Sequence, residues 1–159
     1  MKTVLKLTAL SAFLLMLAGG LVSCNRETPI PFTWISLAGT DPTCDYWGNL
    51  TFDNSVKIIN SLEELENYID CPENRFLDID FSRYSLLIAV GETSGVFRSC
   101  GLPTGFVKKN GNTYILRVTV GISMIQVVGP WISFVLVPKI SENAQITLET
   151  TYTTRRVSC

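Results

Sequence analysis

The sequence predicts one mainly β domain, an antiparallel sandwich or half-barrel of about seven to nine strands with one short helix. Three observations lead to this prediction. Several short segments alternate between apolar and polar residues, turn-forming residues separate them, and only segment 61–70 carries a clear helical signal. The chain has 159 residues, which is enough for one domain, and we expect that domain to occupy residues 34–159.

The first strands are expected before the helix. The β-prone fragments there are Trp34–Leu37, Leu50–Phe52 and Val56–Ile59, with a loop over residues 40–49. The helix is predicted to begin at Ser61, which forms a capping box with Glu64. It is predicted to end before Cys71-Pro72, with Leu62, Leu65 and Ile69 on one buried face.

The remaining strands are expected after the helix. Residues 85–90 form a continuous apolar run, which is typical of a strand buried on both faces. Asn110-Gly111 predicts a hairpin turn, because this pair accepts positive φ angles. Residues 114–120 and 146–154 alternate with a period of two, and residues 131–137 form another apolar strand.

The first 23 residues have the features of a secretory leader. Two lysines precede an apolar stretch over residues 7–18, which is too short to span a membrane. The leader ends in Leu21-Val22-Ser23-Cys24, which resembles the lipobox of bacterial lipoproteins. The resemblance implies that Cys24 is diacylated and becomes the mature N-terminus, and Asn25 then favours the outer membrane. Residues 24–33, which contain two prolines, are expected to be a tether between the lipid and the domain.

Composition excludes several functions. The chain contains no histidine, which rules out Ser-His-Asp and Cys-His catalysis and histidine-bound zinc. Beyond the leader, 11 basic residues stand against 14 acidic ones, a formal charge of −3 without a Lys/Arg cluster. Such a domain is a poor candidate for binding nucleic acid or an anionic membrane. We expect neither a catalytic centre nor a cofactor.

Four cysteines remain after Cys24, which suggests two disulfides in an exported protein. Four cysteines allow three connectivities. Our preferred pairing joins Cys44 with Cys71 and Cys100 with Cys159. A metal site is disfavoured because no two of these cysteines form a CxxC pair.

Two groups of carboxylates are candidates for metal or acid-base sites. Asp78 and Asp80 would lie on one side of an extended segment and form at most a weak calcium site. Glu63, Glu64 and Glu66 are better explained as a solvated helix face placed near the positive end of the helix dipole. No metal site is therefore predicted.

One order of motifs suggests a family. A buried strand leads into Gly91-Glu-Thr-Ser-Gly95-Val96-Phe97, and a later Gly129-Pro130-Trp131 begins an apolar strand that closes with Val137-Pro138-Lys139. This order, over about residues 85–139, resembles the C-terminal domain of regulatory subunits of bacterial surface protease complexes, which is found in small Bacteroidetes-type lipoproteins. The family has a second glycine where this chain has Val96. The resemblance implies a non-catalytic role that regulates or stabilises an exported protease.

The same two loops are more distantly similar to those of chagasin-type cysteine-protease inhibitors. In these immunoglobulin-like sandwiches, two adjacent loops enter a protease cleft, and this chain has Gly129 where the family has arginine. The likeness makes Gly95, Phe97, Pro130 and Trp131 candidate partner-binding residues. The alternative is that glycine and proline only shape turns while the two aromatic side chains belong to the core.

The sequence therefore leaves three functions to compare. The first is a lipid-anchored protein-binding domain that acts on or with an exported protease or another envelope protein. The second is a ligand-binding or structural outer-membrane lipoprotein. The third, an enzyme, has no supporting residues beyond scattered carboxylates.

Overall fold

The computed structural model describes residues 27–35, 48–69, 78–94, 99–122 and 128–154. These residues form eight strands and one short helix. In chain order they are β1 (Thr28–Pro29), β2 (Thr33–Ile35), β3 (Ser55–Ile59), α2 (Leu62–Glu66), β4 (Tyr84–Ser94), β5 (Ser99–Asn110), β6 (Thr113–Gly121), β7 (Val128–Pro138) and β8 (Gln145–Thr153).

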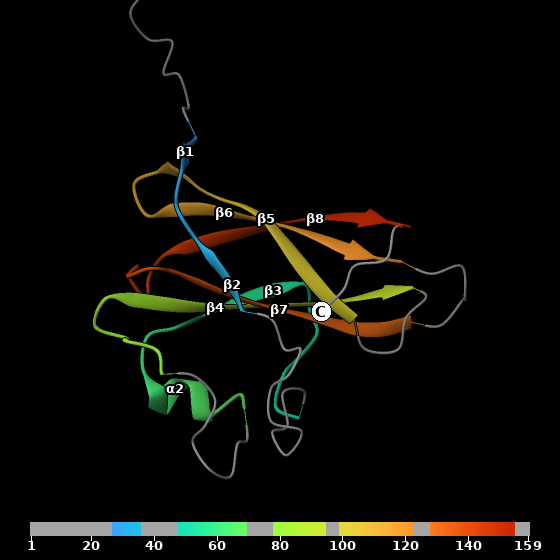
Figure 1. The fold of residues 1–159 in the computed structure, drawn as a ribbon, viewed down its shortest axis with the longest axis horizontal. Coiled ribbons are helices and arrows are strands. Elements are labelled where there is room, and N and C mark those ends of the chain that lie inside the picture. Colours follow the sequence, from blue (N-terminus) through green and yellow to red (C-terminus); the bar gives the residue numbers. More distant parts are fainter. Residues whose placement is uncertain (1–26, 36–47, 70–77, 95–98, 123–127, 155–159) are drawn as a thin grey trace, which may run out of the picture.

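The strands form two sheets that face each other (Figure 1). Sheet A contains β1, most of β5, β6 and β8. Sheet B contains β2, β3, β4 and β7, together with Ser99 and Cys100 at the start of β5. β5 therefore crosses from one sheet to the other, as the oblique yellow strand of Figure 1 shows. This arrangement confirms the predicted mainly β fold with one short helix.

Two of the strand pairings are parallel, although the sequence predicted antiparallel pairing. β6 pairs in parallel with β8, and the start of β5 pairs in parallel with β7. The chain leaves sheet A after β6, runs back through sheet B as β7 and returns to sheet A as β8. Because of this reversal in the other sheet, β8 runs in the same direction as β6.

Sheet B is buried on both faces, as the apolar run in β4 predicted. One face of the sheet packs against α2 and the segments near it, and the other face packs against sheet A. All residues from Leu86 to Val90 are fully buried, because successive side chains of this strand enter opposite cores. The core on the α2 side contains Leu50, Ile59, Leu65, Ile69, Leu86, Ile88, Val90, Ile132 and Phe134.

The core between the sheets carries the largest buried side chains. Phe106 stacks on Tyr114 with ring centroids 5.4 Å apart, and Trp131 is fully buried among its neighbours. The members of this core are Leu87, Ala89, Phe106, Tyr114, Leu116, Val118, Val120, Trp131, Val135, Val137 and Ile140.

The helix begins where the sequence predicted and ends earlier. The Ser61 hydroxyl accepts a hydrogen bond from the Glu64 backbone N–H at 3.1 Å, as an N-cap should. The Glu64 carboxylate accepts from the Asn60 N–H, one residue before the capping-box position. The helix ends at Glu66. The side-chain amide of Asn67 donates a hydrogen bond to the Glu63 carbonyl at 3.0 Å, in place of the backbone N–H that would continue the helix.

The predicted helix face is correct in two of its three residues. Leu65 and Ile69 are buried in the core on the α2 side of sheet B, whereas Leu62 is 48% exposed. Leu62 is the first residue of a five-residue helix. Its side chain therefore lies at the margin of the core, where sheet B no longer covers it.

The domain begins before Trp34, within the predicted tether. Thr28 pairs with Lys108 and Pro29 with Val107, and the Ile30 N–H donates to the Phe106 carbonyl at 2.8 Å. Ile30 and Phe32 also pack against the core between the sheets. The prolines at 29 and 31 are compatible with this edge position, because an edge strand need not donate from every N–H.

The hairpin between β5 and β6 is confirmed, but its two loop residues are Gly111 and Asn112, and of the predicted Asn110-Gly111 pair only the glycine has a positive φ. Asn110 pairs with Thr113, and Gly111 between them has a φ of +47°. Glycine adopts this left-handed conformation without steric cost. In the part of the chain that the structure describes, we find no helix long and apolar enough to cross a membrane.

Candidate functional site

The ends of several strands gather at one end of the sandwich, on the right of Figure 1. There β4, β6 and β8 end and β7 begins. Ser94, the last residue of β4, pairs with Val128, the first of β7. On sheet A, the Ile122 N–H donates to the Thr153 carbonyl at 2.7 Å and so joins the end of β6 to that of β8. We call this region, with Glu92, Thr93, Ile122, Val128 and Tyr152, the open end.

The open end contains a shallow pocket of about 350 Å³. Glu92, Thr93, Ile122 and Tyr152 line it, and it opens broadly to solvent. Thr93 continues the inward-facing series of β4, because Leu87 and Ala89 of the same parity lie in the core between the sheets. Tyr152 likewise continues the series of Ile146 and Leu148. The pocket is therefore the mouth of the space between the two sheets.

Apolar side chains are unusually exposed at this end. Among the described residues, three large hydrophobic side chains are exposed: Leu62, Val128 and Tyr152. Tyr152 is 48% exposed and lines the pocket. Val128 is 67% exposed at the same end, but it continues the β7 series of Ile132 and Phe134, which faces the α2 side of sheet B. An exposed aromatic side chain in a pocket is typical of surfaces that bind another molecule.

Of the two predicted partner-binding loops, the second is not a loop, because residues 129–131 lie within β7 at this open end. Gly95 and Phe97 lie outside the described residues, but the strand that precedes them ends at Ser94, next to the start of β7. Pro130 is described: it pairs with Glu92 and is partly buried. Sequence reasoning missed Val128 and Tyr152, although the alternation of β8 already placed Tyr152 on the face of Ile146.

Trp131 is not available to a partner, which corrects its candidacy as a binding residue. Its side chain is fully buried in the core between the sheets. A Cβ atom added at Gly91 would lie 2.7 Å from Trp131 Nε1, and one added at Gly101 would lie 2.9 Å from its ring. The two glycines thus leave the space that the indole occupies.

The predicted glycine-rich turn also begins later than the sequence suggested. Residues 91–94 are the last part of β4, not part of a turn, and they pair with residues 128–131 of β7. Gly91 is therefore required by the packing of the Trp131 indole, not by a tight turn.

The cysteine predictions fall almost entirely outside the described residues. Cys24, Cys44, Cys71 and Cys159 are not described, and of Cys100 the structure gives the backbone, which pairs with Ile132. Lipidation and the two disulfides stay predictions.

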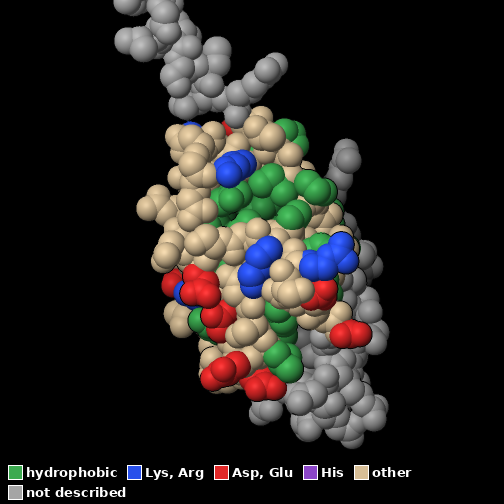
Figure 2. Space-filling view, turned by 90° about the vertical axis from the view of Figure 1, so that its left-hand side faces the viewer, with side chains coloured by type: hydrophobic (Ala, Val, Ile, Leu, Met, Phe, Trp, Pro, Cys, Tyr) green, Lys and Arg blue, Asp and Glu red, His purple; other side chains and the backbone are tan. Residues whose placement is uncertain are grey.

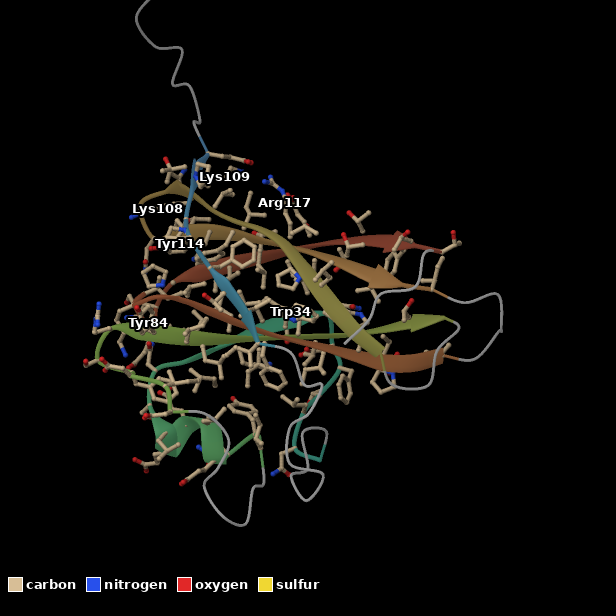
Figure 3. All side chains as sticks on the ribbon, viewed as in Figure 1. Trp34, Tyr84, Lys108, Lys109, Tyr114 and Arg117 are labelled. Atoms are coloured by element: carbon tan, nitrogen blue, oxygen red, sulfur yellow. The ribbon has the colours of Figure 1, made fainter. Side chains whose placement is uncertain are left out.

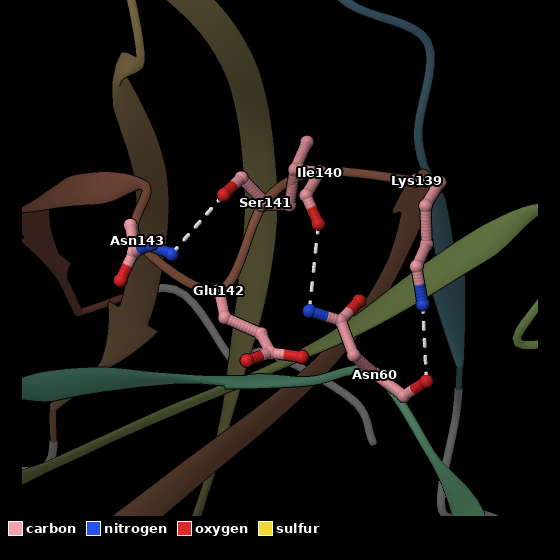
Figure 4. Close-up of a pocket in the computed structure, with 6 residues that line it drawn as sticks. All are labelled: Asn60, Lys139, Ile140, Ser141, Glu142 and Asn143. Carbon is pink, nitrogen blue, oxygen red and sulfur yellow. Dashed lines mark hydrogen bonds between the residues drawn. The ribbon is translucent and has the colours of Figure 1, made fainter.

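A second pocket lies at the opposite end of the sandwich (Figure 4). It measures about 380 Å³ and is also open to solvent. Its lining residues are Asn60, Lys139, Ile140, Ser141, Glu142 and Asn143.

The polar groups around this second pocket are hydrogen-bonded to one another and join separate segments of the chain. The Ser85 hydroxyl, fully buried, donates to Asn60 Oδ1 at 2.6 Å and accepts from the Ile140 N–H at 3.0 Å. The Lys139 ammonium donates to the carbonyls of Asn60, at 3.0 Å, and Phe81, at 2.8 Å. Because these groups join three separate segments, we assign this pocket a structural role and take the open end as the candidate site.

The carboxylates of the described residues do not form a metal site. No three His, Cys, Asp or Glu side chains in this part of the chain lie close enough to hold an ion. Asp80 instead accepts hydrogen bonds from the backbone and the hydroxyl of Ser82. The Ser82 hydroxyl, with smaller help from nearby backbone groups and Arg83, lowers the pKa of Asp80 below its usual value of 3.8.

An ion network fixes the start of the domain on the outer face of sheet A. The Arg117 guanidinium lies 2.9 Å from a Glu27 carboxylate oxygen and 2.8 Å from one of Glu149. Hydrogen bonds to Glu27 first, and then to Glu149, raise the pKa of Arg117 above its usual value. Sequence reasoning missed this network because its three members are far apart along the chain.

These features define a β-sandwich domain with an apolar, shallow mouth at one end. Comparison with protein-family models, curated proteins and solved structures identifies no match to the chain.

Proposed function

We propose that this chain is a lipid-anchored protein of the bacterial cell envelope whose sandwich binds an exported protein at the open end. Its anchor is the diacylated Cys24 in the outer membrane, and its role is to regulate or stabilise an exported protease. The observation that carries the binding role is the exposure of Tyr152 in the mouth of the sandwich, with Val128 also exposed at the same end.

The lipobox supports the anchor. Leu21-Val22-Ser23-Cys24 follows an apolar leader of secretory length. Each methylene of an acyl chain buried in the membrane contributes about 0.8 kcal/mol, so two or three chains hold a protein stably.

The geometry of the open end supports binding of a protein rather than enclosure of a small molecule. Its pocket of about 350 Å³ is broad and open, with a tyrosine on its rim. Tyrosine is enriched among the residues that contribute most to protein interfaces. The resemblance to protease-regulating lipoproteins makes a protease the first partner to test.

A ligand-binding or structural role is the alternative function. An apolar ligand would need a site that buries most of its surface. The two pockets described above are open to solvent instead. For this reason we place protein binding first.

The test is capture of crosslinked partners from the organism's own cells. Tagged, full-length protein is crosslinked gently, extracted in detergent and analysed by quantitative mass spectrometry. We expect a stoichiometric exported protease with the wild type, and a loss of about tenfold or more with Val128→Asp or Tyr152→Ser, because removal of a central contact weakens an interface by this order.

Leu62→Ser provides the matched control, since Leu62 is as exposed as Tyr152 but lies on α2. Capture should be unchanged in this variant. A Cys24→Ala variant should appear in the soluble fraction, and if it stays in the membrane the lipid anchor is wrong. If the open-end variants capture the same proteins as the wild type, the binding site is wrong.

A further inference from the structure

The start of the domain has a defined position and direction. β1 pairs antiparallel with β5, with Thr28 opposite Lys108 and Pro29 opposite Val107. Residues that precede Thr28 therefore come from the side of the β5–β6 hairpin turn. Arg117 holds Glu27 at 2.9 Å, so this entry is fixed on the outer face of sheet A.

Only a short length of chain separates this entry from Cys24. Three residues lie between Cys24 and Thr28, so four Cα–Cα steps join them, and an extended chain spans at most about 3.6 Å per step. The attached lipid is therefore within about 15 Å of Thr28 in any conformation. Such a tether allows the domain to meet the membrane with the hairpin side and keeps the opposite side away from it.

Two cationic side chains lie at this hairpin. Lys108 and Lys109 are exposed and stand beside the start of β1 (Figure 3). The Lys108 ammonium lies 5.7 Å from the centre of the Tyr114 ring, and among the described residues neither lysine forms an ion pair. Because both side chains are exposed, their ammonium groups can approach an anionic surface.

The three glutamates of α2 lie on the opposite side. α2 carries Glu63, Glu64 and Glu66 and lies beyond sheet B, on the far side from sheet A (Figure 1). Figure 2 shows most of the acidic side chains on this face of the molecule below most of its Lys and Arg side chains. On the hairpin side, Glu27 and Glu149 are both paired with Arg117, and Lys108 and Lys109 have no carboxylate partner among the described residues.

We infer that the hairpin end with Lys108 and Lys109 is the membrane-facing surface of the domain and binds the anionic headgroups of phospholipids. The inference rests on the proposed lipid anchor at Cys24. Each lysine close to an anionic membrane increases binding by roughly fivefold, so the two lysines orient an anchored domain without being able to hold it there alone. α2 and its three glutamates then face away from the membrane.

Amine labelling of the purified, acylated protein in vesicles tests this orientation. One set of vesicles contains phosphatidylcholine alone and the other contains phosphatidylglycerol in addition. Labelling of Lys108 and Lys109, read by mass spectrometry, should fall about fivefold in the anionic vesicles relative to the neutral ones. Lys57 on β3 is the internal control, and carboxyl labelling of Glu63 and Glu66 should also stay unchanged.

Repeating the lysine labelling at high salt provides a second test that needs no variant. At about 1 M salt the Debye length falls to about 3 Å, so protection of the two lysines in anionic vesicles should disappear. Equal labelling in both kinds of vesicle, or protection that survives high salt, overturns the inference. Failure of the protein to float with vesicles overturns the lipid anchor itself, and the membrane-facing surface falls with it.

Discussion

Gly91 decides whether the core between the sheets can contain Trp131. The Asn54 side-chain oxygen and the indole nitrogen both lie where a side chain at position 91 would begin. The Asn54 side chain is flexible at its far end and can move, whereas the buried indole is held by the core around it. The indole is therefore the group that a methyl at position 91 would press against.

We predict that Gly91→Ala destabilises the domain by about 1–3 kcal/mol, because the new methyl group overpacks the core against the indole. Gly105→Ala is the control: its nearest neighbour would be the Arg117 stem at 3.8 Å, an ordinary contact. We expect a change within about 0.5 kcal/mol for this variant. Urea unfolding of both variants checks the prediction, and equal stability would show that the indole does not occupy this site.

Asp80 gives a prediction for pH at the same scale. The pKa of its carboxyl is lowered in the folded state, mainly by the Ser82 hydroxyl. A carboxylate with a lowered pKa stabilises the fold above its unfolded pKa, and this contribution is lost as the pH falls through the folded value. In Ser82→Ala the pKa of Asp80 should rise toward 3.8. Titration by NMR checks this, and an unchanged value would mean that the hydroxyl makes no such bond.

At the scale of elements, α2 separates a buried leucine from an exposed one. Leu65 enters the core on the α2 side of sheet B with 3% of its surface exposed, whereas Leu62 is 48% exposed. Leu65→Ala should therefore cost about 2–5 kcal/mol of unfolding free energy, and Leu62→Ala about 0.5 kcal/mol or less. Chemical denaturation measures both. Similar losses would mean that Leu62 is also packed.

The strands could be predicted from local patterns, but their partners could not. The apolar run 85–90, the Asn110-Gly111 turn and the alternation of residues 114–120 are local signals, and each corresponds to a strand or turn of the structure. The parallel pairing of β6 with β8 depends on β7 lying in the other sheet. Such long-range register leaves no local signal in one sequence.

The ends of the tether and of the helix were also mispredicted because contacts outside the local pattern determine them. Pro29 and Pro31 looked like a linker, because the pairing with β5 that holds this segment comes from residues about eighty positions away. The helix ended early because the Asn67 side chain competes for a helix carbonyl. Neither effect changes the hydrophobic pattern from which helix and linker were predicted.

At the scale of the molecule, the two ends of the sandwich differ in their contacts. One end is closed by the buried contacts of Asn60 and Ser85 and by the Lys139 ammonium. The other end has the exposed Tyr152 in its pocket and Val128 exposed nearby on β7. The motif order pointed to β4 and β7, which meet at this open end, but Trp131 is a core residue.

The sequence could not name Val128 and Tyr152 as the exposed pair. Valine and tyrosine are favoured in strands with one buried face. The alternation of β8 indicated that Tyr152 lies on the inward face. Its exposure arises because β8 ends there, and none of the described strands covers it. The exposure of Tyr152 therefore depends on how far the strands of each sheet extend, which one sequence does not show.

Site-specific photo-crosslinking in living cells tests the central claim most directly. A photoreactive residue is placed at position 128, 152 or 62 of the lipidated protein, and the cells are irradiated. The account predicts one discrete adduct with the same exported protein from positions 128 and 152 and none from position 62. Adducts that are absent from the open end of a folded, membrane-bound protein, or equally strong from position 62, would contradict it.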